Sequence, residues 1–467
     1  MFLPLVYEIP YQDPLCVFTL FKEQSGALLL QSAQLRLGSG RYSFIAVEPF
    51  ATLVSKNGNI KLNEKERVGD PFVILQQELA RFSQIHYPEL PPFQGGVAGY
   101  FGYDLCHHLE NVSFIAEDDM QFPDMALGFY DVVIGFDEVE KRAWIFSSGH
   151  PKEENERKEY AKKRLKKLLN QLGQRSIGFS PSTVCCDEKA ITSNFTALTY
   201  SQAVNKVIES ILAGDIFEAN ISQRFRTFLP RGLTAFDLYW RLTVSNPVPF
   251  AAYIHLADTV IVSSSPERFI KLTGRHVETC PIKGTRGRGD TSTNDAKLAN
   301  ELLTSEKDRA ENMMIVDLLR NDLSRVCLPH SVKAPILCQL ETYPSVHHLV
   351  SVVTGTLVDG ITAIDLLRAA FPGGSITGAP KIRAMEVIAD IEPTARGPYC
   401  GSIGYIGFNG DMDTSITIRT FCIKNNNITF QTGGAVVADS DPDAEYQETL
   451  IKANALKRVL VNDFINR

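Results

Sequence analysis

Two segments of the chain carry acidic residues where a purely structural helix would place apolar ones. The first, from about Pro442 to Val461, is predicted as a helix because Asp441-Pro442 is a helix start signal. Four polar residues fall on one face of this helix, since they are spaced i, i+3, i+4 and i+7: Glu445, Glu448, Thr449 and Lys452. Because the face continues into apolar residues, its first turns are expected to line a wet cavity. The alternative is an ordinary salt-bridged helix start, since acids are favoured near the positive end of a helix.

The second segment contains Glu311. It is in register with Met314, Ile315 and Leu318, so a carboxylate falls on a stripe that is predicted to be buried. A buried carboxylate must be paired, protonated or bound to a metal. Carboxylates from two helices suit a hard cation such as magnesium, and magnesium in turn suits an anionic, oxygen-rich substrate.

Lys283 stands between Pro281-Ile282 and Gly284 in a segment rich in glycine and arginine, residues 280–289. This composition predicts an irregular backbone that can direct the lysine into a pocket. A partly desolvated lysine loses its proton more readily and becomes a nucleophile or a base. The alternative is an exposed loop lysine without a chemical role.

Two glycine-rich segments could approach a ligand closely. Residues 372–381 resemble a phosphate loop but fail its pattern, because Ala379-Pro380 separates Gly378 from Lys381. They are predicted instead to form a turn that leads into a helix from Lys381 to Ala389, and the free amides of the turn could hold a carboxylate. Gly433-Gly434, after a predicted strand, offers a similar approach.

Composition excludes several classes of protein. The chain has 467 residues, and 47 basic against 54 acidic residues give a net charge of −7, which disfavours binding to nucleic acid or to an anionic membrane. The nine cysteines form no C-x-x-C motif, so a structural zinc site is not expected. They are expected to be free thiols in a reducing cytosol. The N-terminus does not resemble a signal peptide, and the longest uncharged run, 342–358, is too short and polar to span a membrane. A cytoplasmic protein is predicted.

Along the chain, strands are expected first and a mixture of helices and strands later. The first part, residues 1–150, is predicted to be a β-rich lobe on strand propensity. A charged helix from Lys152 to Leu172 and a linker make up residues 151–195. Helices and strands alternate in residues 196–467, which are expected to form the catalytic lobe, with one or two helices between Asn294 and Arg325.

In this order, nine motifs resemble those of the chorismate-utilising enzymes. They are Gly214 to Asn220, Ser265 to Arg268, Pro281 to Thr285, Asp308 to Asn312, His348 to Ser351, Thr377 to Lys381, Ile418 to Thr420, Thr432 to Ala435 and Glu445 to Thr449. Residues 28–33 and 95–104 also match, so the resemblance covers almost the whole chain. It implies an α+β fold in which two large, mostly antiparallel sheets pack as a sandwich, with helices outside and two interwoven lobes.

Within that family, Lys283 is the discriminating residue. A lysine here resembles the members that aminate C4 of chorismate to 4-amino-4-deoxychorismate, for 4-aminobenzoate and folate synthesis, whereas members that form anthranilate typically carry alanine. Formation of anthranilate is the alternative, and a catalytically silent binding subunit is the competing class. Water-adding members carry lysine where this chain has Glu218 and amine-transferring members usually carry glutamine, so the resemblance assigns no role to Glu218.

The resemblance also implies a role for each site residue. Lys283 would attack C2 of chorismate, with Glu267 as general acid and His348 nearby. Magnesium would be held by three carboxylates: Glu311, Glu445 and Glu448. The substrate would be held by Arg419, Tyr405, Lys452, Gly433, Gly434, Thr377 and Gly378. Ammonia would come from a separate glutamine amidotransferase subunit, and a tryptophan-like pocket could lie near Ser32.

Overall fold

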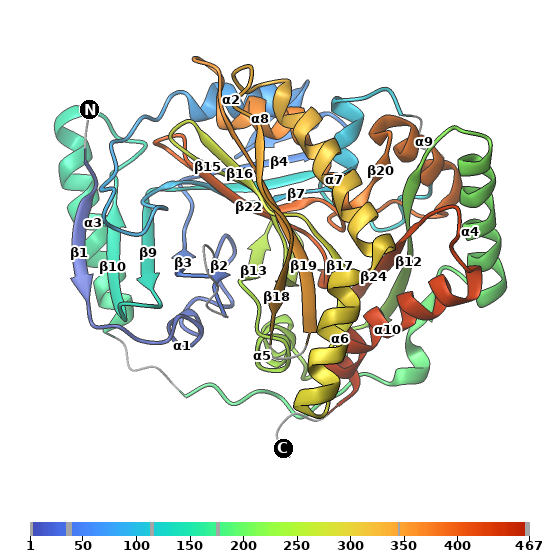
Figure 1. Cartoon of the computed structure of the whole chain (residues 1–467). Helices are drawn as coiled ribbons and strands as arrows, with labels where there is room; N and C mark the ends of the chain where they lie inside the picture. Colours follow the sequence, from blue (N-terminus) through green and yellow to red (C-terminus); the bar gives the residue numbers. More distant parts are fainter. Residues whose placement is uncertain (1–2, 34–39, 113–115, 174–177, 344–345, 463–467) are drawn as a thin grey trace.

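The computed structural model describes residues 3–33, 40–112, 116–173, 178–343 and 346–462. Two large antiparallel sheets dominate the chain (Figure 1). The strands of the first sheet, in spatial order, are β1 (Leu5–Ile9), β10 (Arg142–Ser147), β9 (Val132–Asp137), β3 (Tyr42–Ala46), β2 (Leu28–Gln31), β13 (Phe250–Leu256), β14 (Thr259–Ser265), β23 (Thr420–Lys424), β24 (Asn427–Val436), β12 (Glu218–Phe228) and β11 (Thr192–Ser193), with β20 (Gly378–Ala379) beside β12.

The second sheet combines strands from both halves of the chain in the same way. Its strands, in spatial order, are β17 (Ile282–Gly287), β19 (Val346–Thr356), β16 (His276–Thr279), β15 (Arg268–Thr273), β22 (Met412–Ile416), β21 (Ser402–Gly407), β7 (Gly96–Phe101), β8 (Met125–Tyr130), β4 (Ala51–Lys56), β5 (Asn59–Leu62) and β6 (Lys65–Val68), with β18 (Lys333–Thr342) beside β19. Strands from residues 1–150 and 196–467 therefore share both sheets, and the expected sandwich of interwoven parts is confirmed.

Helices lie outside the two sheets (Figure 1). The α-helices are α1 (Pro14–Phe18), α2 (Pro71–Leu79), α3 (Glu154–Leu172), α4 (Ala197–Leu212), α5 (Ala235–Ser245), α6 (Ser292–Thr304), α7 (Glu306–Ser324), α8 (Ala363–Ala370), α9 (Lys381–Ile391) and α10 (Pro442–Val461). Three short 3₁₀ turns cover Tyr103–His108, Glu188–Ala190 and Gly374–Ile376.

Among the described residues the core forms four apolar clusters, the smallest of which packs α4 and α9 against β12 and β24. Between the sheets, Leu28 and Phe44 of the first sheet pack with Tyr100 and Ile403 of the second. A second cluster joins the outer face of the first sheet to α1, α3, α5 and α10, and a third joins the second sheet to α2, α7, α8 and α9. Burial of these apolar side chains supplies the main driving force for folding.

The segment 250–262 forms a hairpin of β13 and β14, because the chain turns at Ala257-Asp258 and Leu256 pairs with Thr259. One sequence prediction needs correction. Gly433-Gly434 lies within β24, where it pairs with Ser222 and Ile221, and not after the strand.

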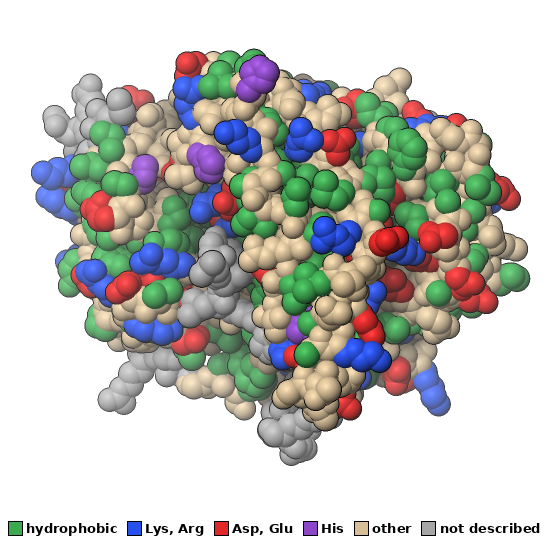
Figure 2. Space-filling view, viewed as in Figure 1, with side chains coloured by type: hydrophobic (Ala, Val, Ile, Leu, Met, Phe, Trp, Pro, Cys, Tyr) green, Lys and Arg blue, Asp and Glu red, His purple; other side chains and the backbone are tan. Residues whose placement is uncertain are grey.

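Acidic and basic side chains are interspersed on the face of the molecule seen in Figure 2. In the described part of the chain, no helix is both long enough and apolar enough to cross a membrane.

Candidate active site

The buried ion pair between Lys283 and Glu218 lies at the centre of the candidate site. Lys283 lies on β17, an edge strand of the second sheet, and Glu218 begins β12 in the first sheet. Their side chains are 11% and 1% exposed, and Lys283 Nζ donates to Glu218 Oε1 over 2.7 Å. The lysine therefore points into the protein, as the sequence predicted, but from a strand and not from an irregular loop.

More carboxylates act on the same amine. Burial alone would lower the pKa of Lys283, but the attraction of Glu218, with smaller contributions from Glu311 and Glu267, raises it above the ordinary value. Burial raises the pKa of Glu311 to about 7, since the nearby positive charge of Lys283 only partly offsets it. Glu311 is partly buried at the edge of the apolar stripe of α7, whose centre is formed by Ile315 and Leu319.

His348 lies on β19, directly opposite Thr285 of β17. Thr285 Oγ1 and His348 Nδ1 are 2.8 Å apart, and the imidazole ring is 5.5 Å from the ring of Tyr343. Because Thr285 is two residues from Lys283, the structure brings His348 to the same end of the sheet as the lysine.

The first turns of α10 bring a second group of charges to β24. Glu445 is buried and accepts a hydrogen bond from Ser440 Oγ at 2.7 Å, whereas Glu448 is half exposed and pairs with Lys452 at 2.7 Å. Lys452 also donates to the carbonyl oxygen of Gly433 at 2.8 Å. A Cβ at Gly434 would lie 2.9 Å from Glu445 Oε2, so the Glu445 carboxylate would have to shift, and 3.8 Å from Glu448 Oε1, which is an ordinary contact.

Electrostatics separates these two carboxylates. Burial raises the pKa of Glu445, and the negative charge of Glu448 adds to this effect. Burial also opposes ionisation of Glu448, but Lys452 and Lys283 outweigh it and hold the pKa of Glu448 below its ordinary value. One buried and one ionised carboxylate thus face the strand at Gly434.

The predicted magnesium ligands are only partly gathered. Their oxygen-only donors are of the type that magnesium prefers. Glu445 and Glu448 lie together, while Glu311 acts on Lys283 from α7. Over the described ranges, no three histidine, cysteine or carboxylate side chains are close enough together to hold a metal ion.

Arg419 and Glu267 lie on backbone that links the two sheets. Arg419 has a positive φ of 51°, and its backbone carbonyl accepts from Ser264 at the end of β14. Burial lowers the pKa of the Arg419 side chain. Among the described residues its guanidinium has no ion pair, which leaves its donors for an anion. Glu267 is buried, and its charge raises the pKa of Lys283.

The loop that contains Thr377 and Gly378 fixes Glu218 from the other side. The backbone amide of Asn220 donates to the Thr377 carbonyl at 2.7 Å, and the Thr377 hydroxyl donates to the Gly373 carbonyl at 2.9 Å. Gly378 has a φ of +152°, and a Cβ there would lie 2.0 Å from the Glu218 carbonyl oxygen. These contacts hold the backbone of Glu218 in one position.

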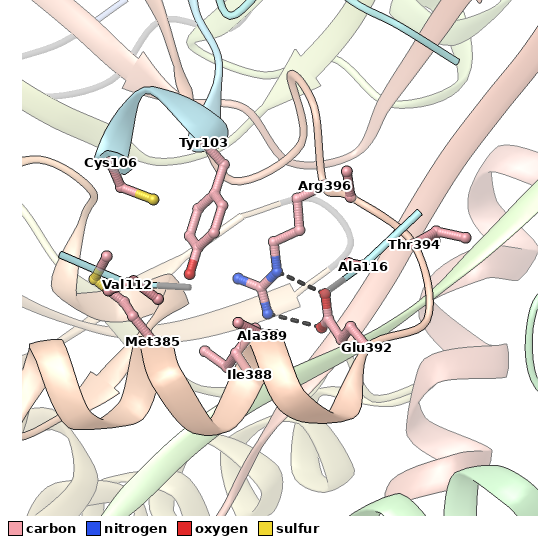
Figure 3. Close-up of a pocket in the computed structure, with 11 residues that line it drawn as sticks. Tyr103, Cys106, Val112, Ala116, Met385, Ile388, Ala389, Glu392, Thr394 and Arg396 are labelled. Carbon is pink, nitrogen blue, oxygen red and sulfur yellow. Dashed lines mark hydrogen bonds and ion pairs between the residues drawn. The ribbon is translucent and has the colours of Figure 1, made fainter. Parts of the chain in front are cut away.

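A buried ion pair that the sequence analysis missed supports this loop. Arg396 donates to Glu392 through two nitrogens at 2.8 and 2.9 Å, above the ring of Tyr103 (Figure 3). It also donates to the carbonyls of Ile376 at 2.9 Å and Asn220 at 2.6 Å. The i, i+4 spacing of Glu392 and Arg396, with Pro393 directly after the glutamate, was the available signal.

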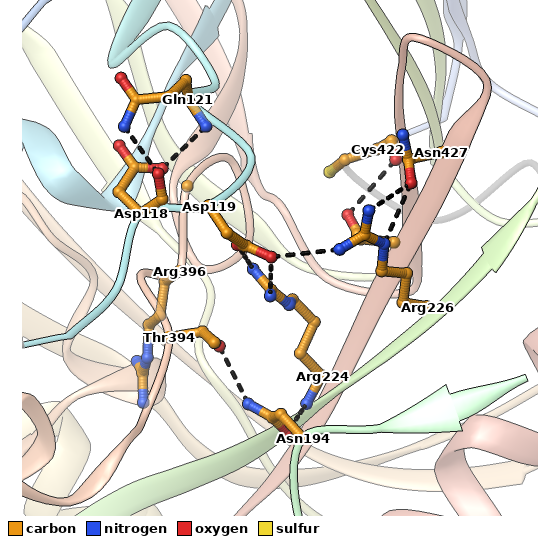
Figure 4. A network of polar contacts seen from close by, with 12 residues as sticks. Asp118, Asp119, Gln121, Asn194, Arg224, Arg226, Thr394, Arg396, Cys422 and Asn427 are labelled. Carbon is orange, nitrogen blue, oxygen red and sulfur yellow. Dashed lines mark hydrogen bonds and ion pairs between the residues drawn. The ribbon is translucent and has the colours of Figure 1, made fainter.

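Further along β12, a polar network fixes the strand to the chain around it. Arg224 and Arg226 both contact Asp119, at 2.8 and 3.3 Å, and the amide of Arg224 donates to Asn194 at 2.7 Å (Figure 4). Asn194 in turn donates to Thr394 Oγ1 at 2.9 Å. The strand that carries Glu218 is therefore held along its length.

Two predicted residues lie elsewhere. Tyr405 is stacked on Phe93 at 4.6 Å and lies 5.5 Å from Phe44, in the apolar layer between the sheets. The predicted contact of Tyr405 with substrate stays a prediction. The Ser32 hydroxyl donates to the Tyr42 carbonyl at 2.7 Å, and a tryptophan pocket beside it stays a prediction.

Comparisons with known proteins identify relatives of this chain. Aminodeoxychorismate synthase component 1 of Escherichia coli K12 is 41% identical over 93% of each chain, and anthranilate synthase component 1 of Acetivibrio thermocellus is 36% identical over 98% of this chain and 95% of its own. The crystal structure of anthranilate synthase component I from Streptococcus pneumoniae TIGR4 superposes with a TM-score of 0.81 at 32% identity, over 91% of this chain and 94% of its own. The family description "chorismate binding enzyme" matches residues 31–458. The chain belongs to the family of chorismate-binding enzymes.

Proposed function

We propose that this chain aminates chorismate at C4 with ammonia and releases 4-amino-4-deoxychorismate, on the route to 4-aminobenzoate and folate. The observation that carries the proposal is the buried amine of Lys283, held among Glu218, Glu267 and Glu311. An amine in this position can act as a nucleophile. The 41% identity to a relative named aminodeoxychorismate synthase component 1 supports the same activity.

The reaction divides one displacement into two. Lys283 forms a bond to C2 of the ring as the C4–O bond breaks, and Glu267 donates the proton with which the hydroxyl leaves as water. Ammonia then forms a bond to C4 while the C2–N bond to Lys283 breaks. Covalent catalysis of this kind replaces one difficult step with two easier ones. His348, which lies opposite Thr285 on the neighbouring strand, would assist.

Cationic side chains bind the two carboxylates of the substrate. Arg419 offers its buried guanidinium to one carboxylate, and Lys452 lies beside Gly433 for the other. Thr377 and Gly378 shape the wall behind Glu218. Charge-assisted hydrogen bonds of this type are the strongest that a protein offers to a carboxylate.

Magnesium completes the site in this proposal. Glu445 and Glu448 would hold it at Gly434, and Glu311 would contribute from α7. The ion would supply positive charge to a substrate carboxylate.

A separate subunit supplies the ammonia. The printed name of the Escherichia coli relative includes the words component 1, which supports a second component, and a glutamine amidotransferase is the class that would release ammonia. We place the protein in the cytoplasm, because all nine of its cysteines are free thiols.

The test is product identification. Purified protein with chorismate, magnesium and ammonium chloride is expected to form 4-amino-4-deoxychorismate, which a lyase for that compound converts to 4-aminobenzoate. Direct release of anthranilate would support the alternative activity named for the 36% identical relative. No consumption of chorismate would support a silent binding subunit.

A further inference from the structure

The partner of Lys283 is itself an unusual group. Glu218 is 1% exposed, its Oε1 accepts from Lys283, and its Oε2 is buried with no hydrogen-bond partner in the described residues. A buried carboxylate oxygen that accepts no hydrogen bond from the protein is costly, because the protein does not replace the hydrogen bonds that this oxygen would make in bulk water. A purely structural ion pair would be expected to use both oxygens.

The position of Glu218 is fixed by backbone contacts. Ala379 of β20 pairs with Glu218 of β12, and the amide of Phe217 donates to the Ala379 carbonyl at 2.7 Å. Gly378 leaves no space for movement toward β20, since even a Cβ there would overlap the Glu218 carbonyl. The carboxylate is therefore held against Lys283 before any substrate arrives.

In the resting pair the amine cannot react. A lysine that attacks carbon must first lose a proton, and the attraction of Glu218 keeps that proton on Lys283. The nearest acceptor is Glu218 Oε1 itself, 2.7 Å away and within the range for direct proton transfer.

We propose that Glu218 is a catalytic base that takes the proton of Lys283 before the attack on C2 and returns it when the lysine is released. The proposal rests on the proposed function. The proton passes from the Lys283 ammonium to Glu218, and the neutral amine then bonds to C2 as the hydroxyl leaves C4 with a proton from Glu267. Ammonia bonds to C4, and the secondary ammonium of the adduct leaves C2 as the neutral lysine. The surplus proton on the new C4 ammonium passes to Glu267, and Glu218 returns its own proton to Lys283. Every group is restored, and the net reaction is chorismate and ammonia to aminodeoxychorismate and water.

Glu218→Gln tests the proposal, because glutamine keeps the shape and a hydrogen bond but cannot accept the proton. Formation of the Lys283 adduct is measured in single turnovers without ammonia, by mass spectrometry of the intact chain, from pH 6 to 10. At pH 7 the variant is expected to be slower by about 100-fold, the scale of general base catalysis, and its rate is expected to rise tenfold per pH unit. The wild type is expected to show a much flatter profile.

The other charged and titratable groups that face Lys283 are unchanged in this variant. They are Glu267, Glu311, His348 and Glu448. The changed profile therefore reports on Glu218. Glu78→Gln is the matched control, because Glu78 is also a buried, ion-paired glutamate, but it lies on α2 and pairs with Arg67 and Arg81. This control is expected to behave as the wild type.

Three results would overturn the proposal. A Glu218→Gln rate equal to or above the wild type at pH 7 would mean that Glu218 only restrains the lysine. A rate lowered equally at every pH would mean a structural role. In Glu218→Ala, formate is expected to restore adduct formation whereas chloride at equal ionic strength does not, and absence of that rescue in a folded variant would also contradict the proposal. Failure of the proposed function is distinct, because the wild type itself would then form no C4-aminated product.

Discussion

Replacement of Lys283 by methionine measures the free energy of its contact with Glu218. Methionine has a similar volume, so the cavity left behind is small. The change leaves the Glu218 carboxylate, 1% exposed, without the cation that lies 2.7 Å from its oxygen. Breaking a buried ion pair in this way costs about 3–5 kcal/mol, whereas removing both charges is often nearly neutral. The single variant is therefore expected to be much less stable than the double variant with Glu218→Gln.

Urea unfolding of four proteins checks this expectation. Wild type, Lys283→Met, Glu218→Gln and the double variant form a cycle, and the difference in the free energy of unfolding is read from their midpoints. A coupling free energy above about 1 kcal/mol between the two positions is expected. Lys297→Met is the control, because Lys297 is 73% exposed and 3.7 Å from Glu301, and its unfolding midpoint is expected to stay unchanged. Additive effects of the two substitutions would refute the claim that Lys283 and Glu218 are one buried pair.

Three further outcomes follow from other residues. Burial, helped by the charges of Asp124 and Asp118 against Lys56, raises the pKa of Asp104 to about 7. Above about pH 4, Asp104 keeps its proton in the folded chain but has lost it in the unfolded chain. The free energy of unfolding therefore falls by up to roughly 4 kcal/mol from pH 4 to 7. In Asp104→Asn this slope is expected to vanish from unfolding curves at pH 5 and 8, and an unchanged slope would contradict the assignment. Gly434→Ala places a Cβ 2.9 Å from Glu445 Oε2 and is expected to raise the magnesium concentration for half-maximal activity by about tenfold, whereas Gly178→Ala, with open space around it, should not. Arg419→Met is expected to raise the KM for chorismate by about 10- to 100-fold, the value of a charged hydrogen bond, and an unchanged KM would exclude Arg419 from substrate binding.

Local signals predicted the helices of the site well. The Asp441 side chain accepts from the amide of Ala444, and Pro442 occupies the first turn, so α10 begins where the start signal placed it. Ser305 ends α6 and caps α7 by accepting from the amide of Asp308. The sequence could therefore predict which helices carry Glu311 and Glu445, because caps and helical spacing depend on neighbours within a few residues.

Such local signals do not predict contacts between segments that are far apart in the sequence. Glu218 and Lys283 are 65 residues apart, and their contact depends on the packing of one sheet against the other. Tyr405 shows the same limit, because a strand pattern does not tell which side of a sheet faces the other sheet, where the Tyr405 ring stacks on Phe93. The Lys283 segment was predicted as irregular from its glycines, but pairing with β19 draws it into a strand with a register shift between Ile282 and Thr285.

The formal charges of the site indicate that the chain alone does not balance the charge of a bound substrate. Five carboxylates line it, namely Glu218, Glu267, Glu311, Glu445 and Glu448, against the three cations Lys283, Lys452 and Arg419. Chorismate brings two more negative charges, so the assembled site would carry an excess of negative charge among partly buried side chains, which is strongly unfavourable. Burial raises the pKa of Glu311 to about 7, so protonation of this carboxyl group relieves part of the excess near neutral pH. A divalent cation at Gly434 would remove two more negative charges, so substrate and cation are expected to favour each other's binding.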